Sequence, residues 1–298
     1  MRKATRKNIL ASIKNPPPTP TTMSKFENYT RTSENYDLTR QPVGLELIFG
    51  ALACGSRPLG EQTVLDAGCG TGNYLPALTS KVARVEGVEF NPGMLGTAQK
   101  KMADCPQLRL QQGSILELPI EDNSCDGIVV NYVVHHLEDG SDASFTATRN
   151  AVAECHRVLA PGGTLVIQTC YAEQYRQGYW YSSLIPSAID RLLHRFIPLD
   201  QLEQGMSEVG LKPGGRLVSL DEVLQGETYL DPLGPTRKEW RDGDSSWALV
   251  EEEELASVTA DIERMVVDGS INEFLAERES LRRQHGQATF VIGRKPLS

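Results

Sequence analysis

The feature that most constrains this sequence is a short apolar run followed by an acid and closely spaced glycines, at residues 63–74. Thr63 to Leu65 is typical of a short buried strand, and a helical pattern begins at Tyr74. Glycines let backbone N–H groups approach a ligand without a Cβ in the way. A strand, a glycine turn and a helix in this order predict a nucleotide-binding corner in an α/β protein.

The residues within this corner narrow the choice of ligand. Asp66 stands at the tip of the predicted strand, and the glycines that follow have G-x-G-x-G spacing. A dinucleotide site is expected to show G-x-G-x-x-G instead. A carboxylate at the strand tip would repel a pyrophosphate, whereas it would hold a ligand that carries an ammonium group.

Strands and helices alternate along the next hundred residues. Apolar runs predict strands at 84–89, 108–112, 126–131 and 164–169, with helices over 92–102 and 145–159. The second of these helices is expected to stop at Ala160-Pro161-Gly162-Gly163, because proline and paired glycines end helices. This alternation predicts a doubly wound, parallel sheet.

Polar residues cluster where these strands end, namely Asp66, Glu89, Ser114, Asn131 and Cys170. Ligands of open parallel sheets bind over the carboxyl ends of the strands. Glu89 also lies 21 positions after Gly68, close to the spacing at which a carboxylate binds ribose hydroxyls. The sequence therefore predicts one ligand site that is shared by several strand ends.

The pattern changes after the fifth strand. Aromatic residues crowd the segment 171–181, and we favour a pocket lining for them over the alternative of a helix core. Helices are expected at 185–196, 199–209, 251–267 and 271–283, strands at 211–220 and 288–294, and a turn-rich segment at 221–248.

Composition excludes several classes of function. The formal net charge of −9 argues against non-specific nucleic-acid binding, which needs a basic surface. The six cysteines are scattered without a C-x-x-C pair, so neither a zinc site nor a disulfide framework is expected. No apolar run reaches the roughly 20 residues of a membrane span. We expect a cytoplasmic protein that acts on a small molecule, and its oligomeric state is left open.

Residues 1–22 differ from the rest of the chain. They carry five basic residues and no acid, followed by the proline run at 16–20. This composition is typical of a disordered tail, upstream of an alternative start at Met23. A mitochondrial presequence is the other interpretation, although the prolines would break its amphipathic helix.

Four linked motifs resemble the class I S-adenosylmethionine-dependent methyltransferases, in particular the small-molecule group of ubiquinone/menaquinone-type (type 11-like) enzymes. They are V-L-D-A-G-C-G-T-G at 64–72, G-V-E-F-N-P-G-M-L at 87–95, the stretch from Ile115 to Asn131, and H-R-V-L-A-P-G-G-T-L at 156–165. The match runs in the family's order from about Gln62 to Gln168.

The resemblance implies a mostly parallel, seven-stranded sheet in which 288–294 is the antiparallel strand. It implies a single domain over 23–298, with N-terminal lid helices at 23–60, a cofactor-binding core at 61–170 and a closing strand at 287–295. The remaining segments, 171–210 and 221–286, are then insertions that cap the substrate.

The same resemblance assigns S-adenosylmethionine as cofactor and S-adenosylhomocysteine as product. Asp66, Gly68, Cys69, Gly70 and Asn131 would face the methionine part. Glu89 would bind both ribose hydroxyls, and Phe90 or Met94 would pack on the adenine. Ser114 and Ile115 stand at the adenine edge, where the family often has an acid before the apolar residue. Tyr36 and Arg40 of the lid would contact cofactor or substrate, or pack as ordinary helix residues.

Methyl transfer to an acceptor is an in-line displacement, so correct positioning can supply most of the acceleration. His136 and His135 are the candidates for a base, with structural hydrogen bonding as the other interpretation. We weigh methyl transfer to a small molecule against aminopropyl transfer, an NAD-dependent enzyme, and a non-catalytic protein that docks through 221–286. The sequence does not identify the acceptor atom.

Overall fold

The computed structural model describes residues 36–297 of the chain. The predicted tail at 1–22, the alternative start at Met23 and the first part of the predicted lid, 23–35, lie outside the described residues.

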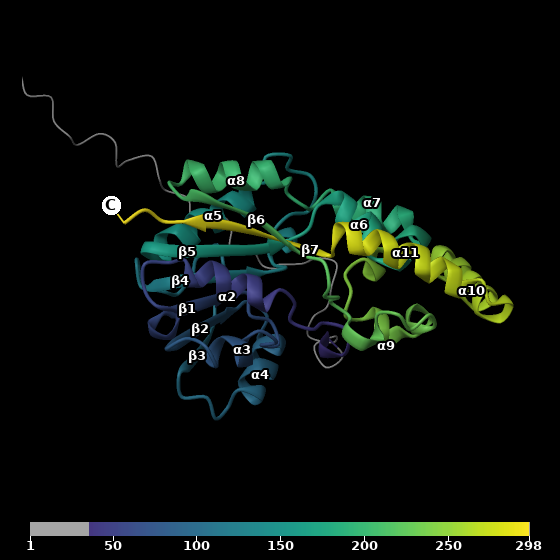
Figure 1. Ribbon diagram of the computed structural model, residues 1–298, viewed down its shortest axis with the longest axis horizontal. Helices are drawn as coiled ribbons and strands as arrows, with labels where there is room; N and C mark the ends of the chain where they lie inside the picture. Colours follow the sequence, from purple (N-terminus) through teal and green to yellow (C-terminus); the bar gives the residue numbers. More distant parts are fainter. Residues whose placement is uncertain (1–35, 298) are drawn as a thin grey trace, which may run out of the picture.

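The core is one seven-stranded sheet in the order β3-β2-β1-β4-β5-β7-β6 (Figure 1). Strands β1 to β5 run parallel, and β7 is antiparallel to both of its neighbours, β5 and β6. The prediction of a mostly parallel, seven-stranded sheet with 288–294 as its antiparallel strand is confirmed. The strands are β1 (Thr63–Ala67), β2 (Arg84–Glu89), β3 (Leu108–Gln112), β4 (Cys125–Asn131), β5 (Leu159–Thr169), β6 (Lys212–Ser219) and β7 (Ala288–Arg294).

Helices cover both faces of this sheet, because its central strands are apolar on both sides. On one face, α2 (Leu45–Ala53) and α3 (Leu75–Thr79) pack with the first turns of α4 (Pro92–Lys101) into a core with Val85, Val129 and Phe290. On the other face, α5 (Thr146–Val158) and α8 (Leu199–Glu208) pack against Leu165 and Val291.

A helical lobe lies at one end of the sheet (Figure 1). It has its own core, in which Trp180, Tyr181 and Ile262 are fully buried. The lobe joins segments on either side of β6, so residues far apart in the sequence share one core. Its helices are α6 (Ala172–Gln177), α7 (Pro186–Leu193), α9 (Lys238–Arg241), α10 (Glu252–Asp268) and α11 (Ile271–His285).

Strand β5 begins earlier than the sequence predicts. Leu159 already pairs with Cys125, so the strand starts there and not at Thr164. The Gly162 amide donates to the Lys295 carbonyl at 2.9 Å, and the Lys295 amide donates to the Gly163 carbonyl at 3.0 Å. Helix α5 ends before Pro161, Gly162 and Gly163, as predicted. The backbone hydrogen bonds with Lys295 then hold these residues in β5.

Strand β1 is also longer than predicted. It continues to Ala67, so Asp66 lies inside the strand and pairs with Gly87 and Val129 rather than standing beyond the tip. The carboxylate is therefore carried by rigid backbone in the middle of the sheet.

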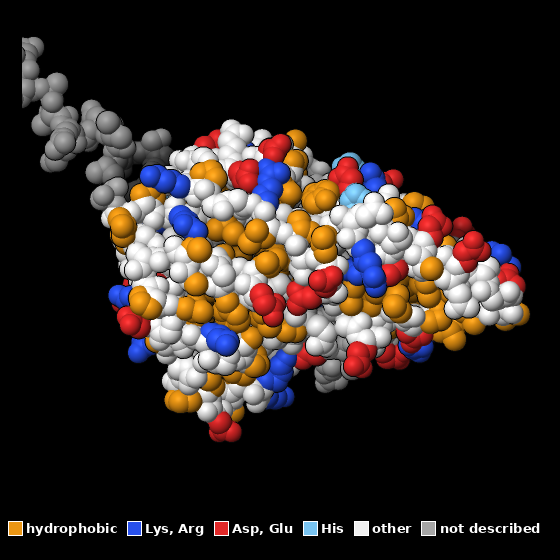
Figure 2. All heavy atoms as spheres, viewed as in Figure 1, with side chains coloured by type: hydrophobic (Ala, Val, Ile, Leu, Met, Phe, Trp, Pro, Cys, Tyr) orange, Lys and Arg blue, Asp and Glu red, His pale blue; other side chains and the backbone are white. Residues whose placement is uncertain are grey.

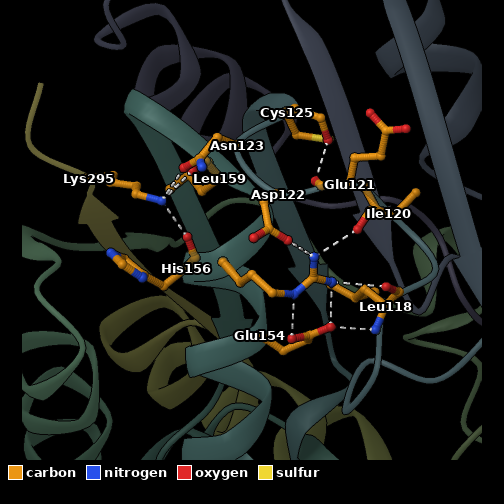
Figure 3. A network of polar contacts seen from close by, with 12 residues as sticks. Leu118, Ile120, Glu121, Asp122, Asn123, Cys125, Glu154, His156, Leu159 and Lys295 are labelled. Carbon is orange, nitrogen blue, oxygen red and sulfur yellow. Dashed lines mark hydrogen bonds and ion pairs between the residues drawn. The ribbon is translucent and has the colours of Figure 1, made fainter. Parts of the chain in front are cut away.

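The connection between β3 and β4 is clamped to α5 by one side chain, Arg157. Figure 3 labels its partners Leu118, Ile120, Asp122 and Glu154. Its guanidinium donates to the carbonyls of Leu118 and Ile120, at 3.0 and 2.9 Å, and binds the carboxylates of Asp122 and Glu154. The planar guanidinium, with its several N–H donors, thereby holds the loop that follows β3 in place.

Among residues 36–297, no helix is both long and apolar enough to cross a membrane.

Candidate functional site

A cavity of about 90 Å³ lies over the carboxyl ends of β1 and β4. Its walls come from the glycine loop, the turn after β4, the segment 36–41 and the helical lobe. The lining residues are Tyr36, Arg40, Gln41, Asp66, Gly68, Cys69, Gly70, Thr71, Asn73, Tyr74, Asn131, Tyr132, His135, His136, Tyr175, Tyr179, Phe196, Leu224, Gly243 and Ser245.

The glycine loop folds back over the end of β2. The amides of Gly68 and Cys69 donate to the Val88 carbonyl, at 2.7 and 3.1 Å. Gly68 has a φ of 85°, and a Cβ there would lie 2.5 Å from a methyl group of Val133. A side chain at this position is therefore excluded by both backbone conformation and space.

Asp66 is the most unusual group in the cavity. It is 1% exposed, and neither carboxylate oxygen has a hydrogen-bond partner among the described residues. Burial, and secondarily the negative charge of Glu89, raise the pKa of Asp66 to about 7. A buried carboxylate without a partner is costly, so this position favours a cationic ligand.

Asn131 completes the polar floor of the cavity. It ends β4, and both polar atoms of its side chain are buried without a partner among the described residues. Buried polar groups are nearly always hydrogen-bonded in folded proteins. Two unsatisfied side chains on adjacent strands, facing one cavity, indicate a place for a polar ligand.

Glu89 contacts the glycine loop but does not line the cavity. Its carboxylate accepts from the Gly70 amide at 2.9 Å and from the Asn91 amide at 2.7 Å. Burial raises its pKa in spite of these hydrogen bonds. The other predicted residues on the β2 and β3 side also lie outside the lining, namely Phe90, Met94, Ser114 and Ile115.

The segment 36–41 is fastened across the glycine loop. The Thr71 hydroxyl donates to Asp37 at 2.6 Å, and Lys101 binds the other oxygen of that carboxylate at 2.7 Å. The Asn73 amide group donates to the Arg40 carbonyl at 2.8 Å. Tyr36 and Arg40 are thereby held as one wall of the cavity.

Arg40 also links this segment to the helical lobe. Its guanidinium lies 3.4 Å from the carboxylate of Asp244, and the two side chains are 15% and 2% exposed. Tyr181 and Ser246 donate hydrogen bonds to the same carboxylate. A buried ion pair therefore holds the cavity wall formed by the segment 36–41 against the helical lobe.

His135 and His136 lie in the turn η3 (Val134–His136) that follows β4. Burial lowers the pKa of both imidazoles, and the charges of Arg195 and Arg40 lower it further, to about 4 for His136. Both rings are thus neutral near pH 7. The Nδ1 atom of His135 is buried with no partner among the described residues.

The aromatic residues at 171–181 were predicted to line a pocket, with a helix core as the alternative, and the structure shows both. Tyr175 and Tyr179 line the cavity, whereas Trp180 and Tyr181 are fully buried in the core of the lobe. Both interpretations of the group therefore hold, for different members.

Sequence reasoning missed several cavity residues. Tyr132 follows Asn131 directly and has a φ of 54°, so its position at a strand end was a usable signal. No motif marks Phe196, Leu224 or Ser245, which reach the cavity through the fold of the lobe.

The known proteins that this chain resembles are methyltransferases. Residues 65–167 match the family described as a methyltransferase domain. An uncharacterised methyltransferase of Mycobacterium tuberculosis is 31% identical over 141 residues, which are 47% of this chain and 67% of that protein. A demethylmenaquinone methyltransferase of Oceanobacillus iheyensis is 33% identical over 128 residues, 40% of this chain and 50% of that relative.

A solved structure resembles the chain over a greater length. It is a protein of Anabaena variabilis, named as a methyltransferase from an antibiotic biosynthesis pathway. It is 20% identical, has a TM-score of 0.65, and the match covers 87% of this chain and 99% of that one. At this identity the similarity is one of fold.

Proposed function

Because this chain belongs to the methyltransferase domain family, we propose that it transfers a methyl group from S-adenosylmethionine to a small-molecule acceptor. The observation that carries the proposal is the unpartnered carboxylate of Asp66, buried beside the glycine loop and next to the unpartnered amide of Asn131. A dinucleotide would place phosphate charge against this carboxylate, whereas the cofactor proposed here carries an ammonium group.

The residues of the cavity fit the methionine part of this cofactor. Asp66 and Asn131 would bind its ammonium group, and the guanidinium of Arg40, which also pairs with Asp244, would bind its carboxylate through its remaining N–H donors.

The β2 and β3 side would hold the nucleoside. Glu89 ends β2 beside the loop and would bind the ribose hydroxyls. Met94, buried at the start of α4, and Phe90 would pack on the adenine, with Ser114 and Ile115 at its edge.

When bound, S-adenosylmethionine supplies a methyl group that is already activated on a sulfonium. The chain therefore needs no nucleophile of its own and acts by holding the acceptor in line. Tyr175, Tyr179 and Phe196 also line the cavity, where they would position an acceptor.

The two histidines would act as neutral hydrogen-bonding groups toward the acceptor. A neutral imidazole can accept a proton, but a pKa of about 4 for His136 makes it a weak base at pH 7. Positioning of an acceptor hydrogen by the open Nδ1 of His135 is the role that the geometry supports better.

Isothermal titration calorimetry tests the cofactor, with S-adenosylmethionine, S-adenosylhomocysteine and NAD as ligands. We expect the first two to bind and NAD not to bind, and the reverse pattern would exclude the proposal. A labelled-methyl assay against a metabolite extract, followed by mass identification of the product, then tests transfer. Binding without any labelled product would favour a non-catalytic cofactor-binding protein.

A further inference from the structure

A second and larger cavity lies beside the candidate site. It encloses about 610 Å³ between the connection from α7 to α8 and the strands β6 and β7. Tyr171 stands at the β5 end of this cavity, and Val218 of β6 lines the opposite side. The second cavity therefore opens at the same edge of the sheet as the first.

One aromatic ring belongs to both cavities. Phe196 lines the 90 Å³ cavity and the 610 Å³ cavity, and it is 7% exposed. Its ring stacks on His135, with centroids 4.5 Å apart and an angle of 13° between the planes. Phe196 is thus a partition between the candidate site and the second cavity.

The wall of the second cavity is mainly apolar. Phe196, Ile197 and Leu199 are buried in it, with Leu193 and Pro198 beside them. Its charged lining residues are all exposed, namely Glu173, Asp200 and Arg216. The charge of Arg216 is already bound by Glu203 at 2.7 Å and by Asp200. A ligand of this cavity would therefore gain free energy from burial of apolar surface rather than from an ion pair.

We propose that the second cavity binds a neutral, apolar part of the methyl acceptor, and that Phe196 sets how this part reaches the reacting end beside His135. The proposal rests on the proposed function, because it concerns the acceptor of that reaction. It assigns a substrate class: acceptors with a polar reacting end and an extended apolar portion.

Two neighbouring residues of β6 provide a matched test. Val218 lines the second cavity and is 38% exposed, whereas Leu217 is 39% exposed on the opposite face of the same strand. Figure 2 shows hydrophobic side chains at the surface over β6 and β7. Val218→Trp fills the cavity, and Leu217→Trp adds the same bulk outside it.

The first measurement uses the neutral apolar dye N-phenyl-1-naphthylamine. We expect one saturable site in the wild type and in Leu217→Trp, and binding weaker by about tenfold, or about 1.4 kcal/mol, in Val218→Trp. Equal dye affinity in the two variants would overturn the proposal.

The second measurement is transfer of labelled methyl groups to the organic-solvent fraction and to the aqueous fraction of a cell extract. We expect the labelled product in the organic fraction, with the yield in Val218→Trp reduced by about tenfold and that in Leu217→Trp retained. Product confined to the aqueous fraction, or equal yields from the two variants, would contradict the proposal.

Binding of S-adenosylhomocysteine separates this proposal from the proposed function. Both variants should bind it as the wild type does, which also shows that they are folded. If the wild type failed to bind it, the proposed function itself would fall. If all three proteins bound it while the two variants behaved alike, only the second-cavity proposal would fail.

Discussion

At the level of single residues, we predict that cofactor binding depends on pH through Asp66. Its pKa is about 7 without ligand, so below that pH it is mostly protonated and must lose a proton to bind an ammonium group. We therefore expect the association constant of S-adenosylhomocysteine to rise by about fivefold between pH 6 and pH 7. The ligand's own amino group belongs to a free amino acid and titrates well above pH 7, so it stays protonated over this range.

Calorimetry in two buffers with different ionisation enthalpies measures the proton released. Asp66→Asn should bind weakly and lose the pH dependence over this range. An unchanged dependence in that variant would assign the titration to another group.

Glu89 gives the second prediction at this scale. Glu89→Ala should weaken binding of S-adenosylhomocysteine by more than about tenfold, because hydrogen bonds to a charged group contribute about 1.5–3 kcal/mol. Glu86→Ala is the control, since Glu86 is an acid of the same solvent exposure, 8%, on the opposite face of the same strand. If both variants bound alike, Glu89 would not be the ribose ligand.

The sequence predicts which residues line the cavity where a residue directly follows the apolar run of a strand. Asp66 and Asn131 were predictable because each closes an apolar run, and the cavity lies between them. Phe196 was not, since its role depends on how the lobe returns to the sheet, which no local pattern specifies.

At the level of elements, the buried pair between Arg40 and Asp244 joins the segment 36–41 to the lobe. Burial alone would raise the pKa of Asp244, but Arg40 and the hydrogen bonds from Ser246 and Tyr181 lower it below its usual range. Asp244→Asn leaves the guanidinium without its counter-charge in a buried site. We expect the free energy of unfolding to fall by about 3 kcal/mol in urea denaturation.

Ser246→Ala is the control for this variant, because it removes one side-chain hydrogen bond to Asp244 and keeps the ion pair. Its expected loss is about 1 kcal/mol. A loss in Asp244→Asn no larger than that of the control would show that the pair does not stabilise the closed segment.

The clamp at Arg157 gives a second prediction for elements. Lysine keeps the charge but lacks the planar fork, so Arg157→Lys cannot reproduce the contacts to two carbonyls and two carboxylates. The free energy of unfolding should fall by about 2 kcal/mol, measured with urea.

Arg149→Lys is the matched control on the same helix, because Arg149 pairs with a half-exposed glutamate at the surface. We expect a change below about 0.5 kcal/mol there. Equal losses at both positions would argue against a special role of the clamp.

The element boundaries show where sequence patterns reach their limit. The apolar run of β4 and the alternation with α4 and α5 were sufficient to place those elements. The extension of β5 through Pro161 and Gly162 depends on backbone hydrogen bonds between this segment and Lys295. A local rule that glycine and proline interrupt secondary structure could not predict these distant partners.

At the level of the whole molecule, the cavity joins the segment 36–41, the glycine loop, the turn after β4 and the helical lobe, so a ligand bound in it should stabilise the entire fold. At 100 times its dissociation constant, S-adenosylhomocysteine adds about 2.7 kcal/mol. For a chain of this size the melting temperature should rise by about 4 °C, measured by thermal shift. NAD is the control ligand, and an equal rise with NAD would contradict a site specific for the proposed cofactor.

The sheet itself was predictable as a class. Alternating strands and helices gave the parallel part, while the antiparallel placement of β7 came from the family resemblance and not from periodicity. Strand β7 lies between β5 and β6, and this position depends on contacts between residues far apart in the sequence. No pattern within residues 288–294 specifies these neighbours.

This placement of β7 bears on how the chain is made. A ribosome delivers β6 well before β7, and until then β6 lacks β7, the strand with which it pairs in the sheet, while Leu217 and Val218 expose apolar surface on both of its faces. The sheet cannot grow by simple addition at its edge, because the last strand synthesised must enter between two earlier ones. Contacts of such sequence separation form slowly, so the waiting strand is the part of the nascent chain most exposed to aggregation.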